Sequence, residues 1–195
     1  TGEFNTSLGS LSMGVGVVTG DNNVAVGYRA GEDLTTGTMN TMIGAYAAYT
    51  LTGGIRNTAL GYGALAKSVD GDKNTAIGYL ALEDYEGADG EGHNTAVGNE
   101  SQLNATTGEY NTSLGSLSMG VGVTTGDHNI AIGYNALTAL TIGNNNVGIG
   151  SGALDALVGG TSNVAIGKAA LSTNIASGKN VAVGYDALVF ADKST

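Results

Sequence analysis

A five-residue motif recurs eleven times along the chain, and its spacing limits the fold more than any other feature of the sequence. The motif is Asn, a β-branched residue, a small residue, an aliphatic residue and Gly, as in residues 57–61 and 94–98. Seven of the ten gaps between successive copies are 17 residues, two are 18 and one is 20. Such a period is typical of solenoid proteins, in which each repeat stacks on its neighbours. We number the repeats as coils 1 to 11, each counted from its Asn at position 0: Asn5, Asn23, Asn40, Asn57, Asn74, Asn94, Asn111, Asn129, Asn146, Asn163 and Asn180.

Positions +1 to +3 predict a β-strand in every coil. Position +1 is always Thr, Val or Ile and position +3 is always Leu, Ile or Val, which are residues that suit a pleated strand. Side chains alternate across a strand, so +1 and +3 share a face, and we expect that face to fill the coil interior. Position +2 is small in every coil except coil 3, where it is Met42. We therefore expect +2 on the opposite face, packed against a neighbouring subunit.

Position +4 is Gly in every coil, which predicts a sharp bend or a close backbone approach. Position +7 is always Ala or Ser, and position +8 is Leu or Met in eight coils. These two positions predict a second apolar segment, either a returning strand or a short turn. The predicted coil-turn glycines are Gly9, Gly27, Gly44, Gly61, Gly78, Gly98, Gly115, Gly133, Gly150, Gly167 and Gly184.

The Asn at position 0 has two interpretations. Asparagines stacked one above another can join their amides into a ladder along the rod. Alternatively, Asn is there because it tolerates a left-handed turn. Because Asn is present in all eleven copies, we favour the ladder. With coils at the sheet spacing, the eleven would form a rod on the order of 50 Å long.

A variable polar stretch closes each coil and takes up the differences in repeat length. The longest version, residues 83–90, is acidic, and we expect it to be a surface loop. Residues 2–28 are nearly duplicated at 108–134, which is consistent with growth by segmental duplication. We treat residues 1–195 as a single repetitive domain. The first residues already belong to a repeat, so we expect the chain to be a segment of a longer polypeptide.

Composition excludes several classes of protein. Gly accounts for 34 of 195 residues, but it does not recur every third residue as in collagen. The formal net charge of −10 opposes binding to nucleic acid or anionic membranes, which requires a basic surface. The chain has no Cys, so it has neither disulfides nor thiolate metal sites. No apolar run reaches the ~18–20 residues of a membrane span.

Residues 71–82 and 126–137 both fit the pattern Gly-x-x-Asn-x-Ala-Ile-Gly-Tyr-x-Ala-Leu. This pattern resembles the head repeats of trimeric autotransporter adhesins, and the related arrays of long bacterial surface proteins and phage tail fibres. The resemblance extends over essentially the whole chain. It implies a left-handed parallel β-roll, three chains side by side, and an exported protein used for attachment. The coils of the adhesin heads are shorter than the 17-residue coils predicted here.

Several motifs have both a functional and a simpler interpretation. Residues 77–82 match one acyltransferase hexapeptide, but such enzymes need several matches per coil. Thr at +1 in six coils would suit ice binding if it were exposed, whereas its exchange with Val and Ile indicates an interior position. We expect no catalytic residues. The candidate metal ligands are His93, His128, Asp21, Asp72 and Asp127.

We interpret these histidines and aspartates as solvated turn residues and expect no cofactor, with calcium in the acidic turns as an open alternative. Tyrosines at +5 either cover coil edges or form an exposed track for a glycan; they are Tyr28, Tyr62, Tyr79, Tyr134 and Tyr185.

The sequence therefore favours an all-β parallel solenoid of about eleven 17-residue coils, left-handed and homotrimeric. The predicted function is structural: a non-enzymatic segment of an extracellular attachment fibre on a bacterial surface, with partners on a host or prey cell or matrix. The alternatives are a phage tail fibre shaft in the virion and a monomeric ice- or ligand-binding solenoid.

Overall fold

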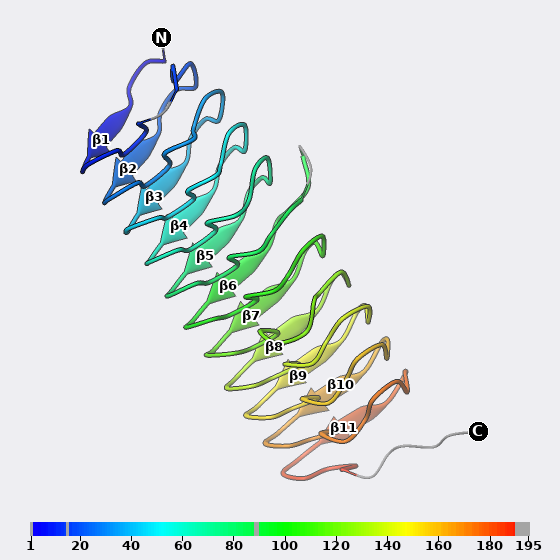
Figure 1. Ribbon diagram of the computed structural model, residues 1–195. Helices are drawn as coiled ribbons and strands as arrows, with labels where there is room; N and C mark the ends of the chain where they lie inside the picture. Colours follow the sequence, from blue (N-terminus) through cyan, green and yellow to red (C-terminus); the bar gives the residue numbers. More distant parts are fainter. Residues whose placement is uncertain (1, 15, 88–89, 190–195) are drawn as a thin grey trace.

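The computed structural model describes residues 2–14, 16–87 and 90–189. The described chain forms eleven three-residue strands in one parallel sheet whose order follows the sequence (Figure 1). It is the β-solenoid that the repeat predicts, and no helix is present among the described residues. The strands are β1 (Thr6–Leu8), β2 (Val24–Val26), β3 (Thr41–Ile43), β4 (Thr58–Leu60), β5 (Thr75–Ile77), β6 (Thr95–Val97), β7 (Thr112–Leu114), β8 (Ile130–Ile132), β9 (Val147–Ile149), β10 (Val164–Ile166) and β11 (Val181–Val183).

Every strand occupies positions +1 to +3 of the motif and pairs in register with the next coil. Thr58 of β4 lies opposite Thr75 of β5, for example. The 20-residue repeat does not disturb this register, because Thr75 still pairs with Thr95. The extra residues therefore lie in the loop before coil 6, and the strands remain stacked.

The direction of the strand side chains is the opposite of our expectation. Position +2 points into the coil: Ala59, Ala76 and Ala96 are completely buried. Positions +1 and +3 point outward and are partly or fully exposed, as in β4, where only the central residue is buried. The physical reason is that each coil has one strand and a narrow interior. The buried +7 and +8 residues, such as Ala64 and Leu65, fill most of that interior, so only a small side chain fits at +2.

Positions +7 and +8 form a turn rather than a returning strand, which was one of the two alternatives. Position +8 has φ between 47° and 56° in every coil, even where the residue is Leu, as at Leu65. Its backbone N–H donates along the rod to position +7 of the next coil, as Leu65 does to the carbonyl of Ala81 at 3.0 Å. This second set of axial hydrogen bonds offsets the cost of the left-handed conformation.

The buried side chains compensate one another in size between coils. Met42 occupies the +2 position of coil 3, where seven coils carry Ala, and it is completely buried. The neighbouring +8 residues are correspondingly small, namely Gly31 and Ala48. A Cβ atom on Gly31 would lie 2.7 Å from the Met42 sulfur atom. Met42 therefore fills the space that Leu fills in other coils.

Substitution of Met42 by Ala is expected to lower the free energy of unfolding by about 2–4 kcal/mol, because removal of the buried side chain leaves a cavity. Adding Ala48→Leu restores the arrangement of the other coils, and we expect it to recover at least half of that loss. Urea unfolding followed by circular dichroism measures both variants. A double variant no more stable than Met42→Ala alone would contradict the compensation.

The acidic insertion is not entirely a surface loop. Tyr85 is completely buried and occupies position +11, between Ser68 and Ala105 of the adjacent coils. These small neighbours leave room for its ring, and burial raises the pKa of Tyr85 well above its usual value. Ala88 and Asp89 of the insertion lie outside the described residues.

Candidate functional site

The eleven asparagines form a hydrogen-bonded ladder inside the rod. In coil 4, the backbone N–H of Asn57 donates to Asn40 Oδ1 at 2.9 Å, and Asn57 Nδ2 donates to the same oxygen at 3.2 Å. Asn57 Nδ2 also donates to the carbonyl of Gly71 at 2.7 Å. Asn57 Oδ1 in turn accepts the backbone N–H of Asn74 at 2.9 Å. Because Asn57 is only 1% exposed, these contacts replace water for both the side chain and the backbone.

The ladder is incomplete at the insertion. In nine of the ten gaps between coils, the residue that precedes each Asn by three positions is Gly or Ser, whereas the residue three before Asn94 is Glu91. The buried Nδ2 of Asn74, which would bond to that carbonyl, has no hydrogen-bond partner among the described residues. The hydrogen bond from the backbone is retained, because the N–H of Asn94 donates to Asn74 Oδ1 at 3.0 Å.

The glycines at +4 bring adjacent coils close together at the end of each strand. Their φ values lie between 129° and 141°, a region that is essentially restricted to Gly. At Gly61, an added Cβ atom would lie 2.3 Å from the carbonyl oxygen of Gly78. The row of glycines is therefore required both by the backbone conformation and by the spacing of the coils.

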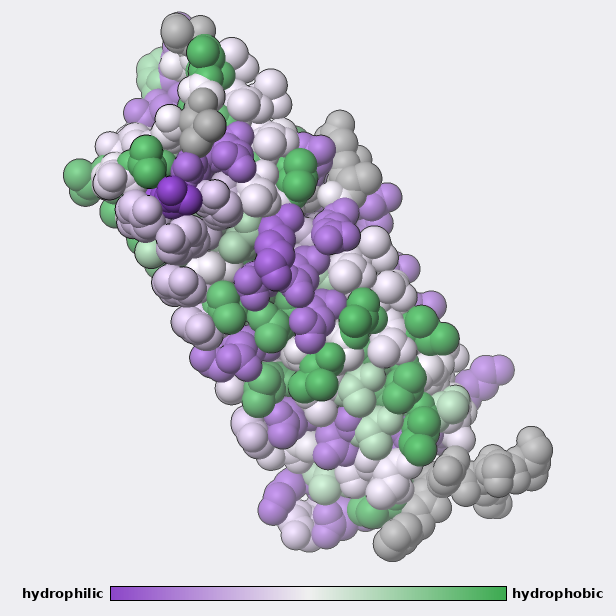
Figure 2. Space-filling view, viewed as in Figure 1, coloured by the Kyte–Doolittle hydropathy of each residue, from purple (hydrophilic) through white to green (hydrophobic). Residues whose placement is uncertain are grey.

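The repeat builds the outward side of the sheet in the same way in every coil. We call positions −1, +1, +3 and +5 together the outer sheet face. Its two central columns carry the β-branched and aliphatic residues of the strands; Leu60 is 42% exposed and Leu114 is 48% exposed. Figure 2 shows one side of the rod, on which hydrophobic residues are interspersed with hydrophilic ones. The columns of partly exposed aliphatic side chains on the outer sheet face are candidates for contact with another molecule.

Positions −1 and +5 form the two edges of the outer sheet face. Position −1 has φ between 56° and 63° in every coil, whatever the side chain. His93 and His128 lie in this column, and both rings stack on Tyr110, with centroid distances of 4.8 Å and 5.0 Å. Desolvation, together with the carboxylates of Glu91 and Asp127, raises the pKa of the nearby Glu109.

The predicted tyrosines at +5 lie on the opposite edge and are exposed. Tyr62 and Tyr79 stack at 5.5 Å along the rod, and Tyr46 of the neighbouring +6 column joins Tyr28 to Tyr62 through edge contacts of 5.4 Å and 5.7 Å. Arg29 lies 5.4 Å from the centre of the Tyr28 ring. The rings therefore contact one another along the axis. That arrangement accounts for edge coverage, and glycan binding stays a prediction.

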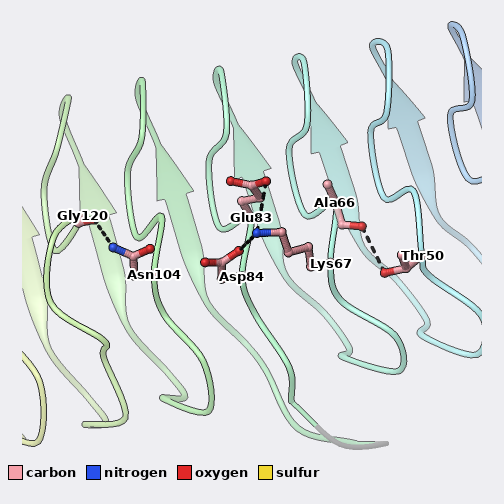
Figure 3. Close-up of polar contacts among 7 residues, drawn as sticks. All are labelled: Thr50, Ala66, Lys67, Glu83, Asp84, Asn104 and Gly120. Atoms are coloured by element: carbon pink, nitrogen blue, oxygen red, sulfur yellow. Dashed lines mark hydrogen bonds and ion pairs between the residues drawn. The ribbon is translucent and has the colours of Figure 1, made fainter.

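The side of the rod away from the sheet carries polar contacts between neighbouring coils (Figure 3). Thr50 Oγ1 donates to the carbonyl of Ala66 at 3.0 Å, and Asn104 Nδ2 donates to the carbonyl of Gly120 at 3.2 Å. Lys67 pairs with Glu83 at 3.5 Å and with Asp84; the hydrogen bond to Asp84 raises the pKa of Lys67. These side chains occupy the same columns in successive coils, and they add polar links between coils at the surface.

The candidate metal ligands form hydrogen bonds or ring contacts between neighbouring coils. One carboxylate oxygen of Asp72 accepts the backbone N–H of Ile55 at 2.7 Å, and Asp127 accepts that of Glu109 at 2.9 Å. Asp21 accepts the N–H of Glu3 in the same way at 2.7 Å. Within residues 2–14, 16–87 and 90–189, no cluster of three or more His, Asp or Glu side chains could hold a metal ion.

The part of the chain that the structure describes contains no helix long and apolar enough to cross a membrane. Comparison of the sequence with models of protein families and with curated proteins, and of the structure with solved structures, finds no match. The geometry of the rod and the chemistry of its surface therefore carry the functional argument.

Proposed function

We propose that this chain is a structural segment of an extracellular attachment fibre on a bacterial surface, in which three copies associate side by side through their outer sheet faces. The observation that carries the proposal is the exposed aliphatic surface of a sheet that runs the length of the rod. The sequence resemblance to adhesin heads supports three copies and a left-handed winding. Anchoring and recognition of a host or prey surface would reside in the variable turns or in other parts of a longer polypeptide.

The mechanism of such a segment is mechanical. Each coil is joined to the next by strand hydrogen bonds, by the axial bonds at +8, and by the Asn ladder inside. A pull along the rod loads these bonds at every coil, and opening one coil requires several buried bonds to break together. A rod built in this way would hold a binding tip at a fixed distance from its anchor.

Association through the outer sheet face follows from its chemistry. The net charge of −10 keeps the rod soluble, but the strand residues at +3 are aliphatic in every coil and include exposed Leu60, Leu114 and Ile166. Burying apolar surface contributes about 25 cal/mol for each Å² removed from water. A second copy presents the same aliphatic columns at the same 17-residue repeat, so the two surfaces match along their length.

Light scattering on the purified chain is expected to give three times the subunit mass of 19.3 kDa. Leu60→Lys places a charge at the centre of the proposed contact, where copies of it would repel one another, and is expected to dissociate the assembly. Val69→Lys is a matched control, because Val69 is 46% exposed but occupies position +12, outside the outer sheet face, and should leave the mass unchanged. A wild-type mass of 19.3 kDa at micromolar concentration would rule out the trimer.

Two alternatives keep some support. A phage tail fibre shaft would have the same architecture, and the genes flanking the locus distinguish it. The outward direction of +1 removes our reason against ice binding, because Thr41, Thr58 and Thr75 form a half-buried, outward-facing row with the Thr residues of coils 6 and 7. The neighbouring +3 column is aliphatic rather than Thr, which favours association. A monomer with thermal hysteresis would establish the alternative.

A further inference from the structure

The two edge columns of the outer sheet face lie on either side of the strand in each coil. Positions −1 and +5 are six residues apart, so at most roughly 20 Å separates them. The ring contacts of these columns run along the rod, as between His93 and Tyr110 on one edge and Tyr62 and Tyr79 on the other. A match between −1 and +5 in the same coil would therefore suit a contact between two copies of the chain.

Such a match exists for the tyrosines. Five coils have Tyr at +5, and in each of them position −1 is a side chain that carries a nitrogen donor. All the Arg and Lys residues of the −1 column fall in these coils. The five pairs are Asn22 with Tyr28, Arg56 with Tyr62, Lys73 with Tyr79, His128 with Tyr134, and Lys179 with Tyr185.

A second match concerns size. Three coils carry a large apolar or aromatic residue at −1, and in each of them position +5 is Ser or Ala. The pairs are Phe4 with Ser10, Met39 with Ala45, and Tyr110 with Ser116. Coils 7 and 8 duplicate coils 1 and 2, so the independent instances are four for the tyrosines and two for the large residues. No coil pairs a large −1 residue of this kind with Tyr.

A shift by one coil disrupts both matches, with a single cation still opposite a tyrosine in each direction. Moved one coil forward, the −1 column would place Met39 against Tyr62 and Tyr110 against Tyr134, so large residues would oppose large ones. Moved one coil back, it would place Arg56 against Ala45 and Lys179 against Lys168, which sets two like charges together. Only the unshifted alignment pairs each cation with a tyrosine and each large residue with a small one.

We propose that copies of this chain associate in parallel and in register, with the −1 edge of one copy against the +5 edge of the next at the same coil. The inference rests on the side-by-side association proposed above and adds its register and its contacts. A rotation axis parallel to the rod brings these two edges together around a closed ring, as a head-to-tail contact does. Arg56, Lys73 and Lys179 would then lie on tyrosine rings or donate to their hydroxyls.

This pairing has a specific role, because the central columns alone would not fix the register. Positions +1 and +3 are similar in every coil, so a copy displaced by one or more coils would bury nearly as much aliphatic surface. Weakly specified faces of this kind are prone to slippage. Side chains that vary from coil to coil at the two edges distinguish the correct register from the displaced ones.

Engineered cysteines test the register directly, because the chain has no Cys of its own. In Lys73→Cys/Tyr79→Cys, a short bifunctional thiol reagent is expected to link neighbouring copies, giving a covalent trimer on a non-reducing denaturing gel. The reagent spans the gap left by the two long side chains, which is wider than the about 7 Å between Cα atoms that a direct disulfide tolerates. The offset pair Lys73→Cys/Tyr134→Cys lies three coils, or about 14 Å, further apart along the rod, and should leave the chain monomeric on the gel, as should each single variant.

The outcomes separate this inference from the proposed function. A trimer in light scattering that crosslinks through the offset pair but not the matched pair keeps the association and overturns the register. A monomer in light scattering overturns both. A second pair of variants needs no crosslinking: Ala45→Tyr, opposite Met39, is expected to raise the dissociation constant about tenfold by overpacking. Adding Met39→Lys recreates the pair of coil 5 and should reverse that rise; an Ala45→Tyr variant that associates normally would contradict the contact.

Discussion

Replacing Asn57 by Ala is expected to lower the free energy of unfolding by about 3–5 kcal/mol, because several buried groups lose their partners together. The Gly71 carbonyl and the N–H of Asn74 lose their bonds to the side chain, which measure 2.7 Å and 2.9 Å. Asn40 Oδ1 loses one of its two donors from Asn57. These groups lie between stacked coils, where water cannot replace the missing bonds.

Two further variants make this prediction specific to the ladder. Asn99→Ser changes an exposed Asn at +5, where coils 7 and 9 already carry Ser, and should change stability by less than about 0.5 kcal/mol. Asn57→Asp keeps the acceptor for Asn74 but sets a buried carboxylate oxygen against the Gly71 carbonyl and Asn40 Oδ1, so at neutral pH a loss at least as large as that of Asn57→Ala is expected. Urea denaturation of the three variants measures the differences. Equal stability of Asn57→Ala and Asn99→Ser would mean that the ladder contributes nothing.

Gly61→Ala is expected to lower the free energy of unfolding by about 3–5 kcal/mol, which is the second large effect. The residue has φ of 135°, where a side chain brings strain of about 1–3 kcal/mol. The new Cβ atom would also lie 2.3 Å from the Gly78 carbonyl oxygen. That oxygen belongs to the backbone of the next coil and cannot rotate away, so overpacking adds a further cost of about 1–3 kcal/mol.

The matched control for this substitution is Gly159→Ala. A Cβ atom there would meet only the Ile142 side chain, at 3.4 Å and 3.5 Å, which are ordinary contact distances. Its stability should therefore equal that of the wild type or exceed it slightly, because Ala restricts the unfolded chain. Thermal unfolding followed by circular dichroism compares the two alanine variants. A Gly61→Ala protein that melts with the wild type would show that the coils can separate at this row.

Much of the fold could be read from the repeat. The constant spacing of Asn57, Asn74 and the other asparagines predicts coils of constant length, and the β-branched residue after each Asn predicts where the strand begins; β4 and β5 begin there. The ladder also follows, since residues one period apart must lie one above another in a stack. Gly61 and its equivalents were also predictable, because a residue type that is the same in every repeat indicates a local requirement of the backbone.

The side on which each residue lies could not be read in this way. Both faces of these strands are apolar, so alternation alone cannot say which one faces inward. The answer depends on how much room the rest of the coil leaves, and Leu65 with Ala64 fills the interior opposite Ala59. Buried Tyr85 likewise depends on Ser68 and Ala105 in the adjacent coils, which the sequence of its own loop does not reveal.

The sequence by itself therefore determined the number of coils, their register and the positions of the Asn and Gly rows, because these depend only on periodicity along the chain. The tertiary structure alone decided that the small +2 residues are inside and the large +1 and +3 residues outside, because this depends on the volume enclosed when a coil closes. That reversal changes the functional argument as well. The surface available for a partner is the aliphatic side of the sheet, bordered by the edge columns at −1 and +5.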